Sequence, residues 1–224
     1  MLSLLAKLTA VLTVVRNADI LISVLRTYRR RFFILKQNSM ATKKWALDPT
    51  HSEIQFKVKH LMISKVTGQF KAFTATVETE GEDVSTSSVD FSADVSSIST
   101  NNEQRDAHLR NSDFFDVDNH PKLTFVSTGM QHIEDEKYKM TGILTMRGVS
   151  KEEVFDVEFG GTVQDPWGNT RMGVEVSGKI NRKDYGVSFS VVSETGSLLL
   201  GEDVSLHIQA EFVELVEKAE AVAS

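Results

Sequence analysis

The sequence predicts an all-β protein of about eight strands, with one short helical segment near residues 102–115. Apolar and polar residues alternate with a period of two through much of the chain after residue 44, which is typical of half-buried strands. That part of the chain shows neither a long helical pattern nor the alternation of strands and helices found in parallel sheets. Strands of this kind need covered edges, which either a sandwich or an up-and-down barrel provides.

The first 39 residues differ from the rest in charge. They carry seven basic residues and one acidic residue, a net charge of +6, whereas the whole chain carries −6, so the remainder carries −12. The apolar run after Lys7 is too short to span a bilayer, and Arg16 and Asp19 interrupt its extension. We expect residues 1–39 to be an N-terminal extension: sequence upstream of a misassigned start, a targeting segment or a membrane-surface helix. Residues 40–224 are expected to form the folded domain.

The first predicted strands follow residue 45. Residues 52–58 alternate cleanly, with Ile54, Phe56 and Val58 on one face. Residues 60–67 are expected to be irregular, and Gly68 precedes a second strand over residues 70–78. A polar turn at 81–87 then leads into a third strand over residues 89–95, in which Phe91 shares a face with Val89 and Val95.

The later strands follow the charged segment. They are predicted over residues 123–127, 138–146, 154–159, 172–176 and 204–212, with turn signals at 147–150, 160–161 and 166–169. Residues 214–223 are the remaining helix candidate, a charged tail. The inward faces of these strands are rich in Phe, Val, Ile and Leu, so a barrel that is not fully packed would hold an apolar cavity suited to a lipid.

The segment from Arg105 to Phe115 breaks the strand pattern. On a helix, Arg105, His108 and Leu109 share one face, and Phe114 and Phe115 lead toward Pro121, which disfavours helix at the preceding residue. We expect this segment to lie across an edge or an opening of the sheet.

Composition and motifs exclude several classes of function. The absence of Cys excludes disulfides, thiolate zinc sites and cysteine nucleophiles. The net charge of −6 argues against a nucleic-acid binder. We find no phosphate loop or dinucleotide fingerprint, and therefore expect no cofactor. The histidines at 51, 60, 108 and 120 match no metal motif, so no metal site is expected.

An enzyme is the minority interpretation. A site built from Ser52, Asp106 and His108 would need triad geometry, which closeness along the chain does not provide, and the sequence has no G-x-S-x-G elbow. A polar rim of His, Asp and Arg around a cavity keeps this alternative open. We expect the protein not to be an enzyme.

Four motifs resemble the YceI-like family of lipid- and polyisoprenoid-binding barrels. They are Trp45–His60, Ser99–Arg110 with its continuation through Asp113–Phe115 to Pro121, Gly142–Lys151, and Ile180–Gly186 with Gly201–Val204. They stand in the family's order and spacing from about Trp45 to about Glu214. The resemblance implies an eight-stranded antiparallel lipocalin-like barrel whose cavity holds a polyisoprenoid, an isoprenoid quinone or a fatty-acyl chain. It also implies a carrier role, with an association with stress response.

The site residues are assigned on the pattern and the resemblance together. We predict that nine residues contact the ligand: Phe56, Val58, His60, Phe91, His108, Leu109, Phe114, Phe115 and Phe125. A structural role is assigned to a second set: His51, Ser52, Arg105, Asp106, Asp184 and Gly186. His51 and Ser52 would satisfy backbone groups at a strand entry, or hydrogen-bond the polar end of a ligand or a neighbouring loop. Asp106 would hold Arg105 or cap the helix, or join Arg105 and His108 in a polar cluster at the mouth of the cavity.

The expected function is to sequester or carry a hydrophobic chain. A filled barrel that acts as a structural or interaction module is the alternative. Relatives often self-associate, which suggests a homodimer, and membrane contact would come through residues 1–39. We expect a cytoplasmic protein if translation starts at Met40, and an exported or membrane-associated one if residues 1–39 act as a targeting segment or anchor.

Overall fold

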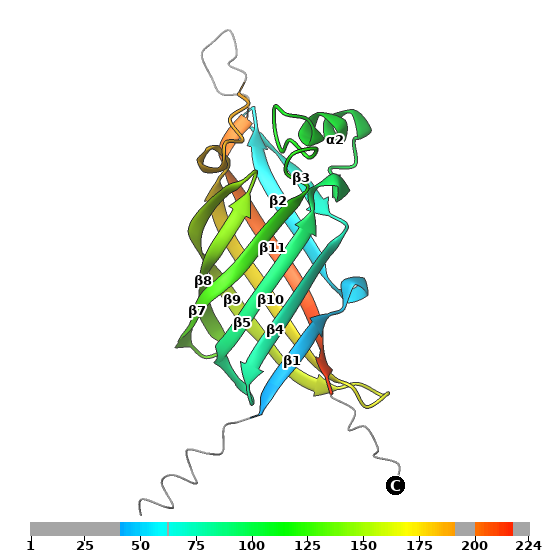
Figure 1. Cartoon of the computed structure of the whole chain (residues 1–224), viewed down its shortest axis with the longest axis vertical. Helices are drawn as coiled ribbons and strands as arrows, with labels where there is room; N and C mark the ends of the chain where they lie inside the picture. Colours follow the sequence, from blue (N-terminus) through cyan, green and yellow to red (C-terminus); the bar gives the residue numbers. More distant parts are fainter. Residues whose placement is uncertain (1–40, 62, 191–199, 217–224) are drawn as a thin grey trace, which may run out of the picture. The chain divides into compact units, whose positions relative to one another are not determined.

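The computed structural model describes residues 41–61, 63–190 and 200–216 of the chain. The compact unit that begins at Thr42 contains the whole barrel (Figure 1). The N-terminal extension predicted at residues 1–39 lies outside the described residues. No helix in the described part of the chain is both long and apolar enough to cross a membrane.

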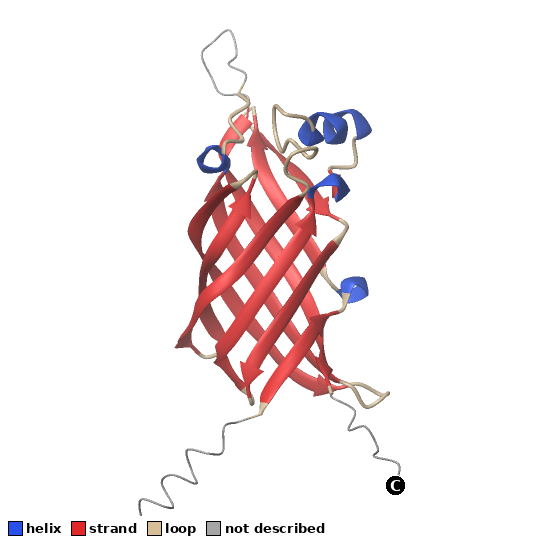
Figure 2. Ribbon diagram, in the orientation of Figure 1, coloured by secondary structure: helices blue, strands red, loops and turns tan. Residues whose placement is uncertain are grey.

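The described residues are mostly strand (Figure 2). The strands are β1 (Thr42–Leu47), β2 (Glu53–His60), β3 (Ser64–Phe70), β4 (Phe73–Glu80), β5 (Asp83–Asp94), β6 (Ile98–Ser99), β7 (Lys122–Glu134), β8 (Lys137–Met146), β9 (Val149–Gln164), β10 (Thr170–Asn181) and β11 (Leu200–Leu215). The helices are the short 3-10 turns η1 (Pro49–His51), η2 (Val95–Ser97) and η3 (Arg182–Tyr185), and the α-helix α2 (Glu103–Arg110).

These strand segments form one closed antiparallel barrel. β11 pairs with β1 at its C-terminal end, where Phe212 lies opposite Leu47, and with β2 further back, where Ile208 lies opposite Ile54. β1 and β2 therefore form two halves of one barrel strand, with η1 between them. The pairs β3–β4 and β5–β6 are interrupted in the same way, because β4 pairs with β1 and β5 while β3 pairs with β2 and β6. With β7 to β11, the described residues fill eight positions, which confirms the predicted eight-stranded antiparallel barrel.

The structure corrects three details of the sequence prediction. Residues 60–67 are not irregular throughout, because β3 begins at Ser64, and Gly68 lies inside this strand opposite Phe56. The polar turn expected at 81–87 is shorter, since β5 begins at Asp83. The helix candidate at 214–223 is contradicted at its start, because β11 continues to Leu215 through pairing with β1; residues 217–223 lie outside the described part. Cross-strand hydrogen bonds lengthen these strands beyond their hydrophobic pattern.

The predicted helical segment is shorter than 102–115. α2 ends at Arg110, and the residues after it form turns in which Phe114 donates its backbone N–H to Asn111 O at 3.1 Å and Phe115 to Leu109 O at 3.1 Å. The segment leaves the barrel wall after β6 and returns at β7, and it lies at one end of the barrel, called here the α2 end (Figure 1).

The hydrophobic core lies inside the barrel. At the end opposite α2, the side chains of Trp45, Val77, Met172 and Phe212 pack together and are almost completely buried. Trp45 also donates its indole N–H to Thr79 Oγ1 at 3.2 Å, so this polar atom keeps a partner inside the core. This cluster packs the interior at the β1 end, and its side chains Val77, Met172 and Phe212 also line a small cavity described below.

Candidate lipid site and the polar clusters around it

The described part of the barrel encloses two neighbouring cavities. The large cavity, about 350 Å³, lies beneath α2, and the small cavity, about 150 Å³, lies deeper toward the β1 end. Both are lined mainly by apolar side chains. Four residues line both cavities: Phe70, Leu123, Ile180 and Leu206. The two spaces are therefore consecutive parts of one interior, separated by these shared side chains.

The nine residues predicted to contact a ligand are divided between the two cavities. Seven line the large cavity and two line the small one. The large cavity has Phe56, Val58 and His60 from β2, His108 and Leu109 from α2, and Phe114 and Phe115 from the turns after α2; the small cavity has Phe91 from β5 and Phe125 from β7. Their contact with a ligand stays a prediction.

Glycines on neighbouring strands position two of these phenylalanines. Gly68 lies directly opposite Phe56 in the sheet, and a Cβ atom built on Gly68 would lie 2.2 Å from Phe56 Cζ. A Cβ atom on Gly142 would likewise lie 2.3 Å from Phe125 Cζ. Each ring therefore occupies the space that a side chain on the neighbouring strand would fill, and this arrangement requires glycine at both positions.

The start of α2 is held by hydrogen bonds that converge on Thr100. The Asp106 carboxylate accepts from the Thr100 backbone N–H at 2.8 Å and from its hydroxyl at 2.5 Å. Arg105 donates to the Thr100 hydroxyl at 2.7 Å and to its carbonyl at 3.0 Å. The N-cap of the helix is Asn102, whose side chain accepts from the Arg105 N–H at 2.9 Å, so Asp106 is not the cap. Arg105 and Asp106 both fix the helix to the chain that precedes it.

Aromatic rings fill the space between α2 and the barrel. The His108 ring lies edge-on to Phe114 and to Phe189, with centroid distances of 5.0 Å in both cases, and Phe114 lies 4.8 Å from Phe189. Phe115 contacts Phe70 edge-on at 6.2 Å. These rings come from α2, from the turns after it and from residues 186–190, so segments far apart in sequence meet over the large cavity.

Two arginines that the sequence analysis did not select hold these segments in place. Arg110 donates to Ser96 O at 2.9 Å and to Ile98 O at 3.0 Å, which ties the end of α2 to η2 and β6. Arg147 donates to Ser112 O at 2.8 Å and also to Gly186 O, and so joins the turn after α2 to the residues after η3. Arg147 belongs to one of the four motifs, but sequence offers no means of finding partners so far along the chain.

The sequence analysis also missed Arg182, a cavity-lining residue. Its side chain is 4% exposed and lines the large cavity. Nε donates to Gly201 O at 2.9 Å, and Nη1 donates to Val187 O at 2.6 Å and to Phe189 O at 2.8 Å. Burial lowers the pKa of the Arg182 guanidinium. A sequence signal existed, because Arg182 stands two residues after Ile180 and so continues the inward-facing alternation of β10.

Asp184 and Gly186 lie on the turn that follows Arg182. The Asp184 carboxylate lies 3.3 Å from Lys151 Nζ, on the protein surface. Gly186 ends η3 with φ of 73°, in the left-handed region that favours glycine, and donates its N–H to Lys183 O at 3.0 Å. Both residues shape the turn and neither lines a cavity.

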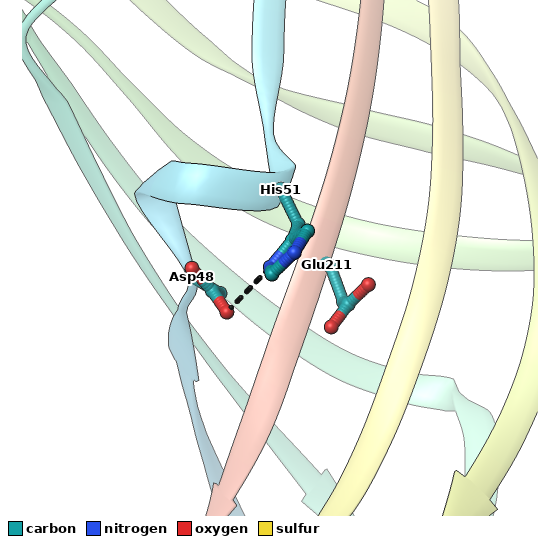
Figure 3. Close-up of side chains that lie close together, drawn as sticks. All are labelled: Asp48, His51 and Glu211. Carbon is teal, nitrogen blue, oxygen red and sulfur yellow. Dashed lines mark hydrogen bonds and ion pairs between the residues drawn. The ribbon is translucent and has the colours of Figure 1, made fainter. Parts of the chain in front are cut away.

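His51 and Ser52 lie away from both cavities, at the break between β1 and β2. The Ser52 hydroxyl donates to Asp48 O at 2.7 Å and accepts from the Glu211 N–H at 3.0 Å, so it satisfies backbone groups at the strand entry. His51 Nδ1 lies 3.0 Å from Asp48 Oδ2, and Glu211 stands on β11 beside this pair (Figure 3). The bond to Asp48 raises the pKa of His51.

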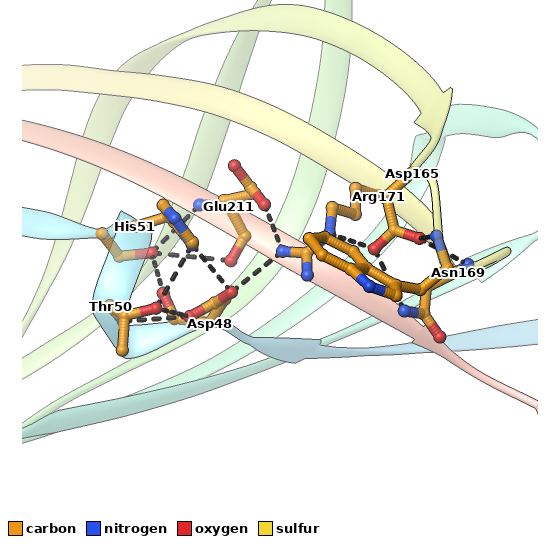
Figure 4. Close-up of polar contacts among 9 residues, drawn as sticks. Asp48, Thr50, His51, Asp165, Asn169, Arg171 and Glu211 are labelled. Atoms are coloured by element: carbon orange, nitrogen blue, oxygen red, sulfur yellow. Dashed lines mark hydrogen bonds and ion pairs between the residues drawn. The ribbon is translucent and has the colours of Figure 1, made fainter.

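Arg171 turns this cluster into a network of ion pairs (Figure 4). Its guanidinium donates to Asp165 at 2.8 Å, to Asp48 at 2.9 Å and to Glu211 at 2.5 Å. Hydrogen bonds from Thr50, His51 and Arg171 hold the pKa of Asp48 well below its usual range. The oxygen and nitrogen atoms of Asp48, His51 and Glu211 lie within 4.8 Å of one another, as metal ligands would. However, Arg171 already supplies the cation between the two carboxylates, which favours a structural cluster that joins β10, β11 and η1.

The three residues considered for an enzyme site are each bonded to a different group. Ser52 bonds to Asp48 and Glu211, Asp106 bonds to Thr100, and His108 Nε2 lies 3.1 Å from Asp113 Oδ2. The geometry therefore does not support a catalytic triad of these residues.

Comparison with known proteins adds sequence relatives and solved structures. The YceI-like domain matches residues 45–212. A UPF0312 protein of Staphylococcus aureus is 42% identical over 169 residues, which cover 75% of this chain and 96% of that protein. The crystal structure of a Campylobacter jejuni YCEI protein is 37% identical and has a TM-score of 0.60; the match covers 72% of this chain and 90% of that one. A polyisoprenoid-binding domain from Saccharophagus degradans shares the fold at 16% identity, with a TM-score of 0.57 and coverage of 76% and 98%.

Proposed function

The chain belongs to the family of YceI-like domains, and from this membership and the two apolar cavities we propose that it binds and carries the hydrophobic chain of a lipid. A polyisoprenoid, an isoprenoid quinone and a fatty acid all provide such a chain. The polyisoprenoid-binding domain of Saccharophagus degradans, which has the same fold, supports this class of ligand.

The large cavity is the observation that carries the proposal. Its volume of about 350 Å³ falls within the range of about 300–1,000 Å³ that is typical of small-molecule sites. Burying a hydrocarbon chain there stabilises the complex by roughly 0.8 kcal/mol for each CH₂ group. A filled barrel, the alternative function considered, would have side chains in this space, so the cavities argue against it.

The segment from Arg105 to Phe115 closes the large cavity in this proposal. His108, Leu109, Phe114 and Phe115 face the cavity, while the hydrogen bonds of Arg110 and Arg147 keep the segment over the α2 end. A ligand would enter or leave after this segment shifts, and the apolar side chains would then repack over the bound chain.

Mass spectrometry of the purified full chain tests the proposal. The protein is measured in its native state and again after extraction with organic solvent. A co-purifying prenyl or acyl species in near-stoichiometric amount is the expected result and identifies the chain. A bare protein that also takes up no long-chain isoprenoid or fatty acid in a titration would overturn the proposal and favour an interaction module.

A further inference from the structure

The large cavity contains one buried cationic group with an unused donor. The Nη2 atom of Arg182 has no hydrogen-bond partner among the described residues, although the other guanidinium nitrogens donate to three backbone carbonyls. An unpaired buried donor costs free energy, more so when its group is charged. Native proteins therefore rarely keep one without a functional reason.

The charge on Arg182 also lacks a direct partner within the described residues. No carboxylate oxygen there lies within 4.0 Å of its guanidinium, and Glu202, the acidic residue that influences it, is paired with Lys183 at 2.5 Å. Three carbonyl dipoles solvate the cation in part. A negatively charged oxygen at Nη2 would supply the missing bond and balance the charge together.

The other ionisable residues that line the described part of the large cavity are an arginine and two histidines. Among the described residues that line it, the ionisable ones are His60, Arg105, His108 and Arg182, and none is Asp or Glu. This contrasts with the chain as a whole, whose net charge is −6. The large cavity therefore combines apolar walls with a basic character, which suits an anionic head group on a hydrophobic chain.

From this arrangement, and resting on the proposed lipid-binding function, we infer that the ligand is an amphiphile whose anionic oxygen head, a carboxylate or a phosphate, binds Arg182 Nη2. The chain would then run toward Ile180, which lies two residues earlier, near the end of β10, whereas Arg182 begins η3. Ile180 lines both cavities, so a chain that starts at Arg182 and passes Ile180 enters the small cavity.

Matched head groups on the unaltered full chain test the inference first. Palmitate and hexadecanol are compared with geranylgeranyl phosphate and geranylgeraniol in a displacement titration. A charge-assisted hydrogen bond favours each anion over its alcohol by about 10- to 100-fold. The palmitate and phosphate arms show which of the two heads the site prefers. Equal affinity of both anions and their alcohols would overturn the inference while the carrier function stands, and binding of none of the four would overturn both.

A variant assigns the preference to Arg182. In Arg182→Met the ratio of the affinity for each anion to the affinity for its alcohol should fall to about one, while hexadecanol still binds. Lys179→Met is the matched control, because Lys179 is an exposed lysine three residues earlier, on β10, outside both cavity linings, and it should keep the preference. A folded Arg182→Met chain that still prefers anions would refute the role of Arg182.

A spectroscopic measurement covers the case in which Arg182→Met does not fold, since its side chain holds three carbonyls. The ¹³C signal of carboxyl-labelled palmitate on the unaltered chain is followed against pH. A carboxylate held by Arg182 titrates below about 4.3, the ordinary value of a carboxyl group. A carboxyl group buried without such a partner titrates above that value, and this result would overturn the inference.

Discussion

Replacing Leu206 by Phe should shorten the longest chain that the barrel accommodates. Leu206 lines both cavities, so a larger ring at this position narrows the connection between them. The small cavity has a volume of about 150 Å³. An apolar cavity of about that size holds one benzene molecule, or roughly six carbon atoms. At roughly 0.8 kcal/mol for each CH₂ group, six carbons contribute about 5 kcal/mol, or somewhat more than three orders of magnitude in Kd.

The assay measures affinity across a homologous series of saturated fatty acids. In the unaltered chain, affinity should rise by about fourfold for each added carbon until the interior is filled. In Leu206→Phe the rise should stop about six carbons earlier, in proportion to the volume that becomes inaccessible.

A volume-conserving variant is the control for this series. Leu206→Met should cost less than about 1.5 kcal/mol of stability. The plateau, meaning the chain length at which affinity stops rising, should be the same as in the unaltered chain. An identical plateau in a folded Leu206→Phe chain would refute the argument that a ligand occupies both cavities through this connection.

Further predictions concern the α2 end and the surface ion pairs. Phe115→Ala should weaken lipid retention or lower the unfolding free energy by up to about 3 kcal/mol, since the ring is only partly buried; unchanged values in chemical denaturation and lipid extraction would contradict its closing role. Tyr185→Phe should cost about 1 kcal/mol in chemical denaturation, because it loses the 2.6 Å hydrogen bond to Glu153; an unchanged denaturation midpoint would count against that bond. Arg171→Met should melt at a lower temperature than the unaltered chain at neutral pH. The pKa values of Asp48 and Asp165 are lowered in the folded chain, so these carboxylates contribute stability above their ordinary pKa near 3.8, and this contribution is lost as pH falls below it. The difference in melting temperature between Arg171→Met and the unaltered chain should therefore shrink in acid. A difference that does not change with pH would refute the network. The raised pKa of His51 has the opposite sign: its contribution is complete below 6.5 and disappears as pH rises through the higher folded value, so His51→Gln should lower the melting temperature more at about pH 5.5 than at about pH 8.5, and the reverse order would disprove it.

Strand periodicity is a local property, so the residue pattern predicted an all-β fold, and the resemblance to the YceI-like family predicted the barrel. Alternating residues such as Ile54, Phe56 and Val58 must face one side of a strand, and strands with one apolar side must enclose it. The same argument selected Phe91 and Phe125 as inward-facing, and the structure places both beside the small cavity. The break at Arg105 to Phe115 was visible for the same reason, since its charges do not fit the strand pattern.

Some strand boundaries could not be read from that pattern. The sequence placed Gly68 between an irregular segment and the second predicted strand, whereas it lies within β3. The Phe56 ring on the neighbouring strand occupies the space that a side chain at position 68 would take. Local sequence records the small residue, but the reason for it lies on another strand.

Only the tertiary structure decided which polar groups meet and which are left without a partner. Arg171 bonds to Asp48, which lies more than a hundred positions earlier in the chain. Arg147 bonds to Ser112, which precedes it in sequence, and to Gly186, which follows it. Arg182 stands in a recognisable motif, but only the folded chain shows that its Nη2 donor has no partner among the described residues, while three carbonyls bind the other nitrogens. Periodicity determines the face on which a side chain lies, whereas hydrogen bonding depends on the closed barrel, which brings distant strands within bonding distance.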